Sequence, residues 1–100
     1  MNNASYYTSY IRHCLRFYAR YEHLDTFNSE ADKQNWKACN KAFKKFSDGD
    51  KELLLTLYQS RGDFSEIVAD TSRLEDMNIE DLWRMIRKLE RAVATLRGLI

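Results

Sequence analysis

Apolar residues recur at steps of three and four along most of this chain, which is the period of an amphipathic α-helix. The repeat is most regular near the end of the sequence, where it runs through Leu82, Ile86, Leu89, Val93, Leu96 and Ile100. The pattern predicts five helices, with approximate bounds Ser5–His23, Glu30–Phe46, Asp48–Ser60, Phe64–Arg73 and Asn78–Ile100. The apolar faces of the first four helices are expected to carry, in the first, Tyr7, Tyr10, Cys14, Tyr18 and Tyr21, and in the second, Trp36, Cys39, Phe43 and Phe46. The third is expected to bury Leu53, Leu54, Leu57 and Tyr58, and the fourth Ile67, Val68 and Leu74.

Four of the predicted helices begin with a capping side chain followed three residues later by a carboxylate. The pairs are Ser29/Asp32, Ser47/Asp50, Asp63/Glu66 and Asn78/Asp81. The cap oxygen accepts a backbone N–H that has no partner inside the helix, and the carboxylate favours the positive helix start. Each pair opens an apolar-periodic stretch, so together they support the helix assignment.

Composition points to one all-α domain. The chain has 100 residues, of which 44% are hydrophobic and 13% aromatic, with no proline and three glycines. Such a chain can form a real core, and it has few of the turn residues that strands and hairpins require. We therefore expect residues 1–100 to form a single five-helix domain.

Charge is segregated along the sequence although the net charge is only +1. Residues 51–77 carry three basic and six acidic groups, whereas the chain from Arg84 onward carries five basic groups and only Glu90 as an acid. This distribution predicts one basic face and one acidic face.

Three further rows of side chains have two interpretations each. The arginines Arg12, Arg16 and Arg20 form either a solvated face or a contact surface for an acidic partner. The lysines form either a solvated face or a second surface for phosphates, and they are Lys33, Lys37, Lys41 and Lys44. The tyrosines of the first helix either pack in the core or stack on bases.

The sequence offers no motif for catalysis or for a cofactor. His13 and His23 lie nearly three helical turns apart, and there is no metal-ligand spacing, phosphate-binding glycine loop or nucleophile motif. Cys14 and Cys39 are expected to be buried free thiols, the alternatives being a disulfide or a metal ligand. We therefore expect no enzyme activity, no metal, no cofactor and no small-molecule substrate.

No apolar run approaches the roughly 20 residues of a membrane span, and the first residues lack the features of a secretory signal. A cytoplasmic protein without a membrane partner is the expectation.

The last forty residues predict a helix-turn-helix, because a short helix, the turn Leu74–Met77 and a long basic helix follow one another. Ala69 can supply the small residue where the two helices touch. The corner between them is expected to be held by Val68, Leu74, Ile79 and Leu82.

Within this region the segments Leu53–Tyr58, Glu66–Ala69 and Leu82–Leu99 resemble region 4, the C-terminal DNA-binding region of sigma-70-type factors. The chain looks most similar to the small sigma-region-4-like proteins of Gram-positive bacteria, their phages and mobile elements. The resemblance covers about residues 48–100, the helix-turn-helix portion, and leaves residues 1–46 as an N-terminal helical pair. It implies a transcription-related DNA-binding protein.

The turn differs from the usual pattern of this motif. Its usual glycine is absent, Arg73 stands nearest that place, and Ser72 stands where an apolar residue is usual. The carboxylates Glu75, Asp76, Glu80 and Asp81 would lie near phosphates at the start of the reading helix, where like charges repel.

The DNA-binding residues predicted from the sequence are Arg84, Arg87, Lys88 and Arg91. Arg84, nearest the helix start, suits a bidentate contact to guanine, and the other three suit phosphates. Alternatively, these side chains only keep an amphipathic helix in solution, and Trp83 and Met85 beside them belong to the core or to an interface.

A second functional interpretation is a non-enzymatic protein-interaction module. It would bind RNA polymerase, or it would form a homodimer through the apolar seam from Leu82 to Ile100.

Overall fold

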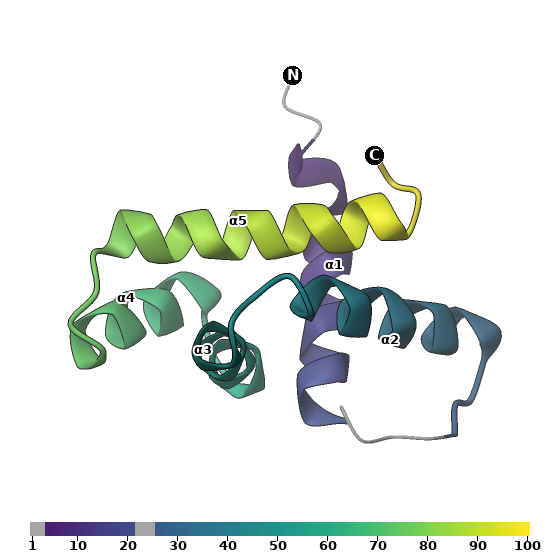
Figure 1. Cartoon of the computed structure of the whole chain (residues 1–100), viewed down its shortest axis with the longest axis horizontal. Coiled ribbons are helices and arrows are strands. Elements are labelled where there is room, and N and C mark those ends of the chain that lie inside the picture. Colours follow the sequence, from purple (N-terminus) through teal and green to yellow (C-terminus); the bar gives the residue numbers. More distant parts are fainter. Residues whose placement is uncertain (1–3, 22–25) are drawn as a thin grey trace.

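The computed structural model describes residues 4–21 and 26–100, which form five α-helices and no strand. The helices are α1 (Ala4–Arg20), α2 (Glu30–Phe43), α3 (Asp48–Gln59), α4 (Phe64–Leu74) and α5 (Ile79–Leu96). Figure 1 shows α4 alongside the first half of α5 and α2 alongside its second half, with α1 crossing α5 and α2. The all-α, five-helix prediction is confirmed.

The four predicted helix starts are confirmed, because each capping side chain accepts a backbone N–H of the first turn. Ser29 accepts from Asp32, Ser47 from Asp50, Asp63 from Glu66, and Asn78 from both Glu80 and Asp81.

Four helices end earlier than predicted, α3 by a single residue at Gln59. Helix α5 ends at Leu96 because Gly98 adopts a left-handed conformation with φ 74°, and the N–H of Leu99 then bonds to the carbonyl of Ala94 at 2.9 Å. Helix α2 ends at Phe43, and backbone hydrogen bonds between residues three apart, as in a 3₁₀ turn, continue to Phe46. Helix α1 ends at Arg20, and the predicted end at His23 lies outside the described residues.

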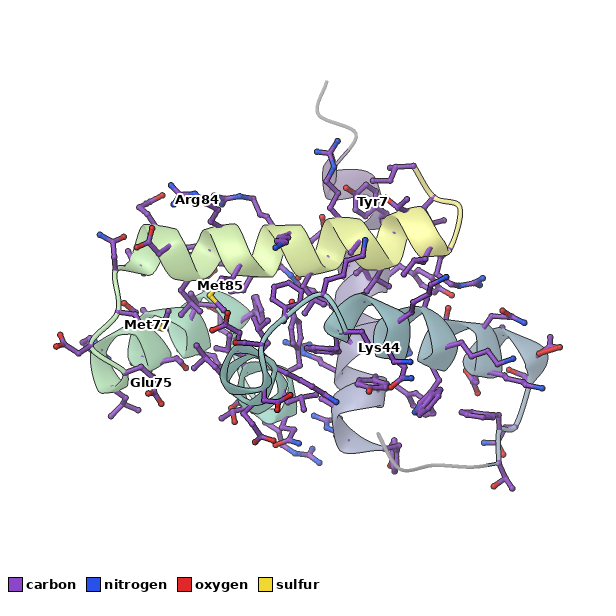
Figure 2. All side chains as sticks on the ribbon, in the orientation of Figure 1. Tyr7, Lys44, Glu75, Met77, Arg84 and Met85 are labelled. Atoms are coloured by element: carbon purple, nitrogen blue, oxygen red, sulfur yellow. The ribbon has the colours of Figure 1, made fainter. Side chains whose placement is uncertain are left out.

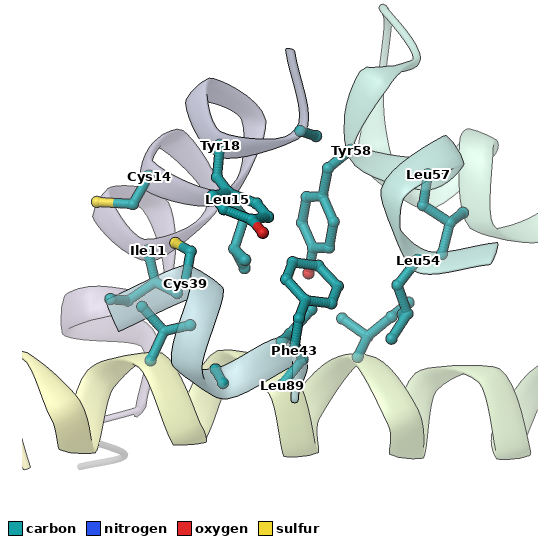
Figure 3. Packing of buried hydrophobic residues seen from close by; sticks show 14 of the residues in the cluster. Ile11, Cys14, Leu15, Tyr18, Cys39, Phe43, Leu54, Leu57, Tyr58 and Leu89 are labelled. Carbon is teal, nitrogen blue, oxygen red and sulfur yellow. The ribbon is translucent and has the colours of Figure 1, made fainter. Parts of the chain in front are cut away.

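One core joins all five helices, and Figure 3 shows part of it. Helix α1 packs against α2, α3 and α5, while α5 also packs against α2 and α4. The largest fully buried side chains are Tyr18, Tyr58, Phe43, Ile11, Leu15, Leu54, Leu57, Leu82, Ile86, Leu89, Val68 and Val93. Each stabilises the fold by about 1.5–3 kcal/mol relative to an exposed side chain.

Some predicted core positions are wrong. Leu74 is 85% exposed, Leu96 37% and Ile100 53%, because all three lie at or beyond a helix end where no neighbouring helix covers them. Tyr10 and Tyr21 of the tyrosine stripe are also exposed, at 43% and 51%, whereas Tyr7 packs partly buried against the core.

The two thiols lie in the core as predicted. Cys14 and Cys39 are free and buried, on α1 and α2 respectively. Burial raises the pKa of both thiols above the ordinary value, most strongly for Cys39.

The arginine row of α1 is not a solvated face along its whole length. Arg12 is only partly exposed and forms an ion pair with the buried Glu90 of α5 at 2.9 Å. Its guanidinium also lies 4.4 Å from the ring centre of Phe64. At Arg12, the acidic group that contacts the arginine row is therefore Glu90 of the same chain and not part of another molecule.

Candidate nucleic-acid interface

The turn between α4 and α5 is fixed by main-chain hydrogen bonds. The N–H of Met77 bonds to the carbonyl of Ser72 at 2.9 Å, and the N–H of Asp76 to the carbonyl of Arg73 at 3.3 Å. This is a Schellman motif, and its left-handed residue is Asp76 with φ 51°. The position usually given to glycine is thus Asp76 and not Arg73, and aspartate tolerates this backbone better than most residues do.

The hydrogen bond of Ser72 accounts for a serine at this position of the turn, where an apolar residue is usual. The Ser72 side chain is buried, and its hydroxyl donates a 2.7 Å hydrogen bond to the carbonyl of Met77. The hydroxyl therefore satisfies a main-chain acceptor of the turn, which an apolar side chain could not do.

The predicted corner between α4 and α5 is only partly correct. Val68 and Leu82 are fully buried, but Ile79 is 40% exposed and Leu74 points largely into solvent. Met77, from the turn itself, packs against the core and takes over part of their role.

Four basic side chains of α5 form an exposed row, here called the basic ridge and made of Arg84, Arg87, Lys88 and Arg91. At about 100° per residue these positions fall within about 100° of arc, opposite the buried stripe that contains Leu82 and Ile86. Figure 2 shows Arg84 on the edge of α5 that faces away from α4. The four predicted side chains therefore lie together on one side of the helix.

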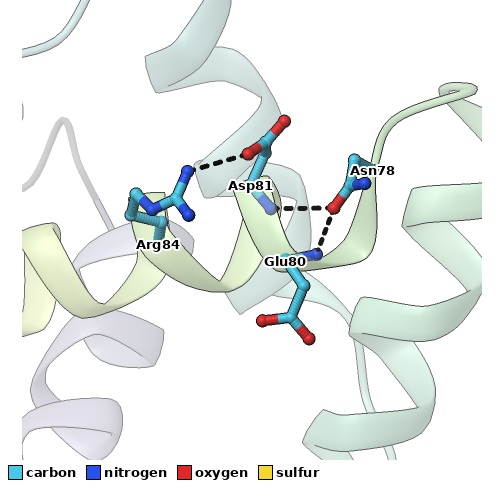
Figure 4. A network of polar contacts seen from close by, with 4 residues as sticks. All are labelled: Asn78, Glu80, Asp81 and Arg84. Carbon is cyan, nitrogen blue, oxygen red and sulfur yellow. Dashed lines mark hydrogen bonds and ion pairs between the residues drawn. The ribbon is translucent and has the colours of Figure 1, made fainter.

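The acids of α4 do not neutralise the ridge. Asp70 forms an ion pair with Arg73 of its own helix. Arg84 is paired with Asp81 at 2.9 Å, also within one helix, as Figure 4 shows. Within the described part of the chain, Arg84 is the one ridge residue that has an ion pair.

Lys88 extends the basic surface toward the end of α2. Its ammonium lies 5.1 Å from the ring centre of Phe46, which follows the exposed residues Lys44 and Lys45. A cation above an aromatic face keeps its charge and its access to solvent. Lys45 lies off the periodic lysine row, so sequence periodicity does not single it out, although it is exposed and precedes Phe46.

The first turn of α5 has the opposite charge. Glu75, Asp76, Glu80 and Asp81 are all exposed where α4 leads into α5. Positive charge on α5 therefore begins at Arg84 and lies over the middle of the helix.

The apolar seam predicted for self-association is mostly used inside the chain. Leu82, Ile86, Leu89 and Val93 are each 0% exposed, in contact with the other helices of the same core. A homodimer through this seam would require the core to open, so the structure offers no exposed apolar seam on α5 for self-association.

No group of three or more His, Cys, Asp or Glu residues in the described ranges is arranged to hold a metal ion. Among the same residues, no helix combines the length and apolar character needed to cross a membrane. Comparisons with protein-family models, curated proteins and solved structures found no match to this chain.

Proposed function

We propose that the chain binds duplex DNA, with α4 and α5 acting as a helix-turn-helix and α5 entering the major groove. The observation that carries this proposal is the basic ridge, which is exposed on a helix anchored by five fully buried side chains. Arg84 and Arg91 are seven positions apart, which is about 10 Å along a helix. The major groove is about 12 Å wide and admits an α-helix, so side chains on the exposed face of α5 can reach base edges and flanking phosphates.

On this proposal the contact lies at the middle of α5, and the charge pattern supports that position. Phosphates would be repelled by Glu80 and Asp81 at the helix start and attracted from Arg84 onward. Arg87, Lys88 and Arg91 are then the phosphate contacts, and Lys44 and Lys45 extend the same charge toward the flanking backbone.

Arg84 is the candidate for reading a base. Its ion pair with Asp81 is largely solvent-exposed, and such pairs are worth about 0–1 kcal/mol. A pair this weak leaves the guanidinium available to a base edge, where a bidentate contact to guanine discriminates against other bases by about 1–3 kcal/mol.

The proposal is tested by fluorescence anisotropy with a pool of labelled duplexes between about 50 and 200 mM salt. Wild-type protein is expected to bind with a steep salt dependence. Single changes Arg87→Ala, Lys88→Ala and Arg91→Ala should each weaken binding to all duplexes alike and reduce the salt slope by about 1. Arg84→Ala should reduce discrimination between duplexes.

A matched control is Arg20→Ala, which removes an exposed arginine at the last position of α1. Figure 1 shows this end of α1 pointing away from α5. The Arg20→Ala change should leave binding near the wild-type value. Equal losses for Arg20→Ala and Arg87→Ala would show that only the net charge matters. That result, or no salt-sensitive binding at all, contradicts the proposal.

The resemblance to sigma region 4 supports the same function and adds the expectation of a transcription-related role. RNA polymerase as a partner is a proposal on the same footing. It predicts that a complex with polymerase forms without DNA, which size-exclusion chromatography can detect.

A further inference from the structure

A second surface lies on the other side of α4, where an open groove of about 340 Å³ runs between α3 and α4. We propose that this α3–α4 groove is the docking site for a basic amphipathic helix of a partner protein. The groove is lined by Gly49, Glu52, Leu53 and Thr56 from α3, and by Thr71, Leu74 and Glu75 at the end of α4. Its volume is at the lower end of the range of about 300–1,000 Å³ that is usual for binding pockets.

Leu74 gives the groove its apolar anchor. Its side chain is 85% exposed, the most of any large hydrophobic side chain in the described residues, while Leu53 beside it is half-buried. The Schellman turn holds Leu74 in place, because the hydrogen bonds of Asp76 and Met77 fix the end of α4. An exposed leucine on a rigid element contributes nothing to the core, but it is available to a partner's apolar side chain.

Acidic groups select the charge of the partner. Glu52 and Glu75 line the groove, and none of its described lining residues is basic. Three more exposed carboxylates lie nearby in sequence, Asp48 and Asp50 at the start of α3 and Asp76 in the turn. The basic residues of the same stretches are Lys51 and Arg73, and Arg73 is paired with Asp70, so acidic groups are in excess. Like charges across an interface are costly, so an acidic peptide or a nucleic acid is disfavoured here.

A helix with lysine or arginine beside its apolar stripe fits both features. Leucine-like side chains at spacings of three and four would contact Leu53 and Leu74, and the basic side chains would reach Glu52 and Glu75. Extended or purely polar segments would leave Leu74 uncovered.

The groove and the basic ridge face different directions. Figure 2 shows Glu75 on the side of α4 turned away from α5, and Arg84 on the side of α5 turned away from α4. The chain can therefore hold a basic partner and a polyanion at the same time. The groove proposal is independent of DNA binding.

The test uses two labelled peptides of about 15 residues, one with leucine at helical spacing and lysine elsewhere, the other with glutamate in place of lysine. Binding is measured by anisotropy, and the contact is located by the amide NMR shifts of α3 and α4. The lysine peptide is expected to bind at least tenfold more tightly than the glutamate peptide. Leu74→Ala is expected to weaken it about tenfold or more, since it removes most of the anchor's apolar area.

The double variant Glu52→Gln/Glu75→Gln should also weaken the lysine peptide and reduce its salt dependence. A matched control is Leu99→Ala, which truncates a leucine that is 41% exposed near the other end of α5. It should leave peptide binding unchanged, and Leu74→Ala should leave DNA binding unchanged.

Three outcomes would overturn the proposal. In the first, the two peptides bind equally. In the second, a lysine peptide whose leucines are moved off helical spacing binds as well as the original, which would reduce the effect to charge alone. In the third, light scattering shows a dimer that Leu74→Ala abolishes, so that a second copy of the chain occupies the groove.

Discussion

Arg12 of α1 donates a 2.9 Å hydrogen bond from Nε to Oε2 of Glu90 in α5, across 78 positions of sequence. The hydroxyl of Tyr58 in α3 donates to the same oxygen, also at 2.9 Å. Three helices therefore meet at one carboxylate whose side chain is only 8% exposed. A buried charge is tolerated because both an opposite charge and a hydrogen bond compensate for its lost hydration.

Glu90→Ala is expected to lower the free energy of unfolding by about 3 kcal/mol, because it leaves Arg12 and Tyr58 without their shared acceptor. Glu90→Gln keeps an acceptor oxygen and should cost less. Urea denaturation monitored by circular dichroism measures both. The exposed Glu80 provides the control, and Glu80→Ala should stay within about 0.5 kcal/mol of wild type. If Glu90→Ala behaves like Glu80→Ala, the carboxylate does not join the helices energetically.

Tyr58→Phe is expected to cost about 1–2 kcal/mol at neutral pH, since Glu90 loses a donor. Burial and the neighbouring carboxylate of Glu90 raise the pKa of Tyr58 well above its ordinary value. The unfolded chain ionises this tyrosine near pH 10, so its stabilising contribution is complete below about pH 10 and is lost as the pH rises toward the folded-state pKa.

The stability difference between wild type and Tyr58→Phe should therefore shrink above about pH 10, which unfolding curves from pH 8 to 11 can follow. Tyr21→Phe, at a half-exposed tyrosine, should show no such convergence. A difference that stays constant with pH contradicts a buried, neutral Tyr58.

Both cysteines should react slowly with thiol reagents in the native protein. Thiolate is the reacting form, and burial both raises the pKa of Cys14 and Cys39 and blocks access to them. Labelling followed by mass spectrometry should proceed only as the chain opens, and should become fast for both thiols in denaturant. The single variants Cys14→Ala and Cys39→Ala assign each rate. Fast native labelling of Cys39 would show that α1 and α2 separate readily.

Asp76→Gly is expected to stabilise the fold by about 0.5–1 kcal/mol, because glycine adopts the left-handed backbone without the steric cost of a Cβ atom. Thermal or chemical denaturation measures the change. Glycine at the neighbouring Glu75, where φ is −92°, should destabilise instead, which makes Glu75→Gly the matched control. Two changes of the same sign would mean that the turn geometry does not limit stability.

Local signals predicted the helix starts well and the helix ends less well. A cap such as Ser29 or Asn78 acts on N–H groups two or three residues away, so the sequence alone contains both partners. The end of α5 depends on the left-handed backbone of Gly98. Apolar residues continue at Leu99 and Ile100, so the periodicity predicted a helix that runs on past this glycine. At the end of α4 the left-handed residue is an aspartate, which no glycine rule identifies.

The basic ridge was predictable for a related reason. Residues three and four apart lie on one helix face, so the positions of Arg84, Arg87, Lys88 and Arg91 in the sequence already placed them together. The contact of Lys88 with Phe46 and the exposed position of Leu74 in the α3–α4 groove were not predictable in this way, because the packing of one helix on another determines both.

The sequence by itself determined the five helices, their caps and the side of α5 that carries positive charge, since these follow from interactions within a few residues. Tertiary structure alone decided which charges meet and which leucines remain uncovered. In the sequence Arg12 is part of an arginine row that looks exposed, but in the structure it is paired with Glu90 of α5. Leu74 is part of an apolar stripe in the sequence, but at the end of α4 it lies outside the core and is exposed. Contacts between distant residues depend on how whole helices cross, and the periodicity within one helix does not determine the crossing angle or the partner helix.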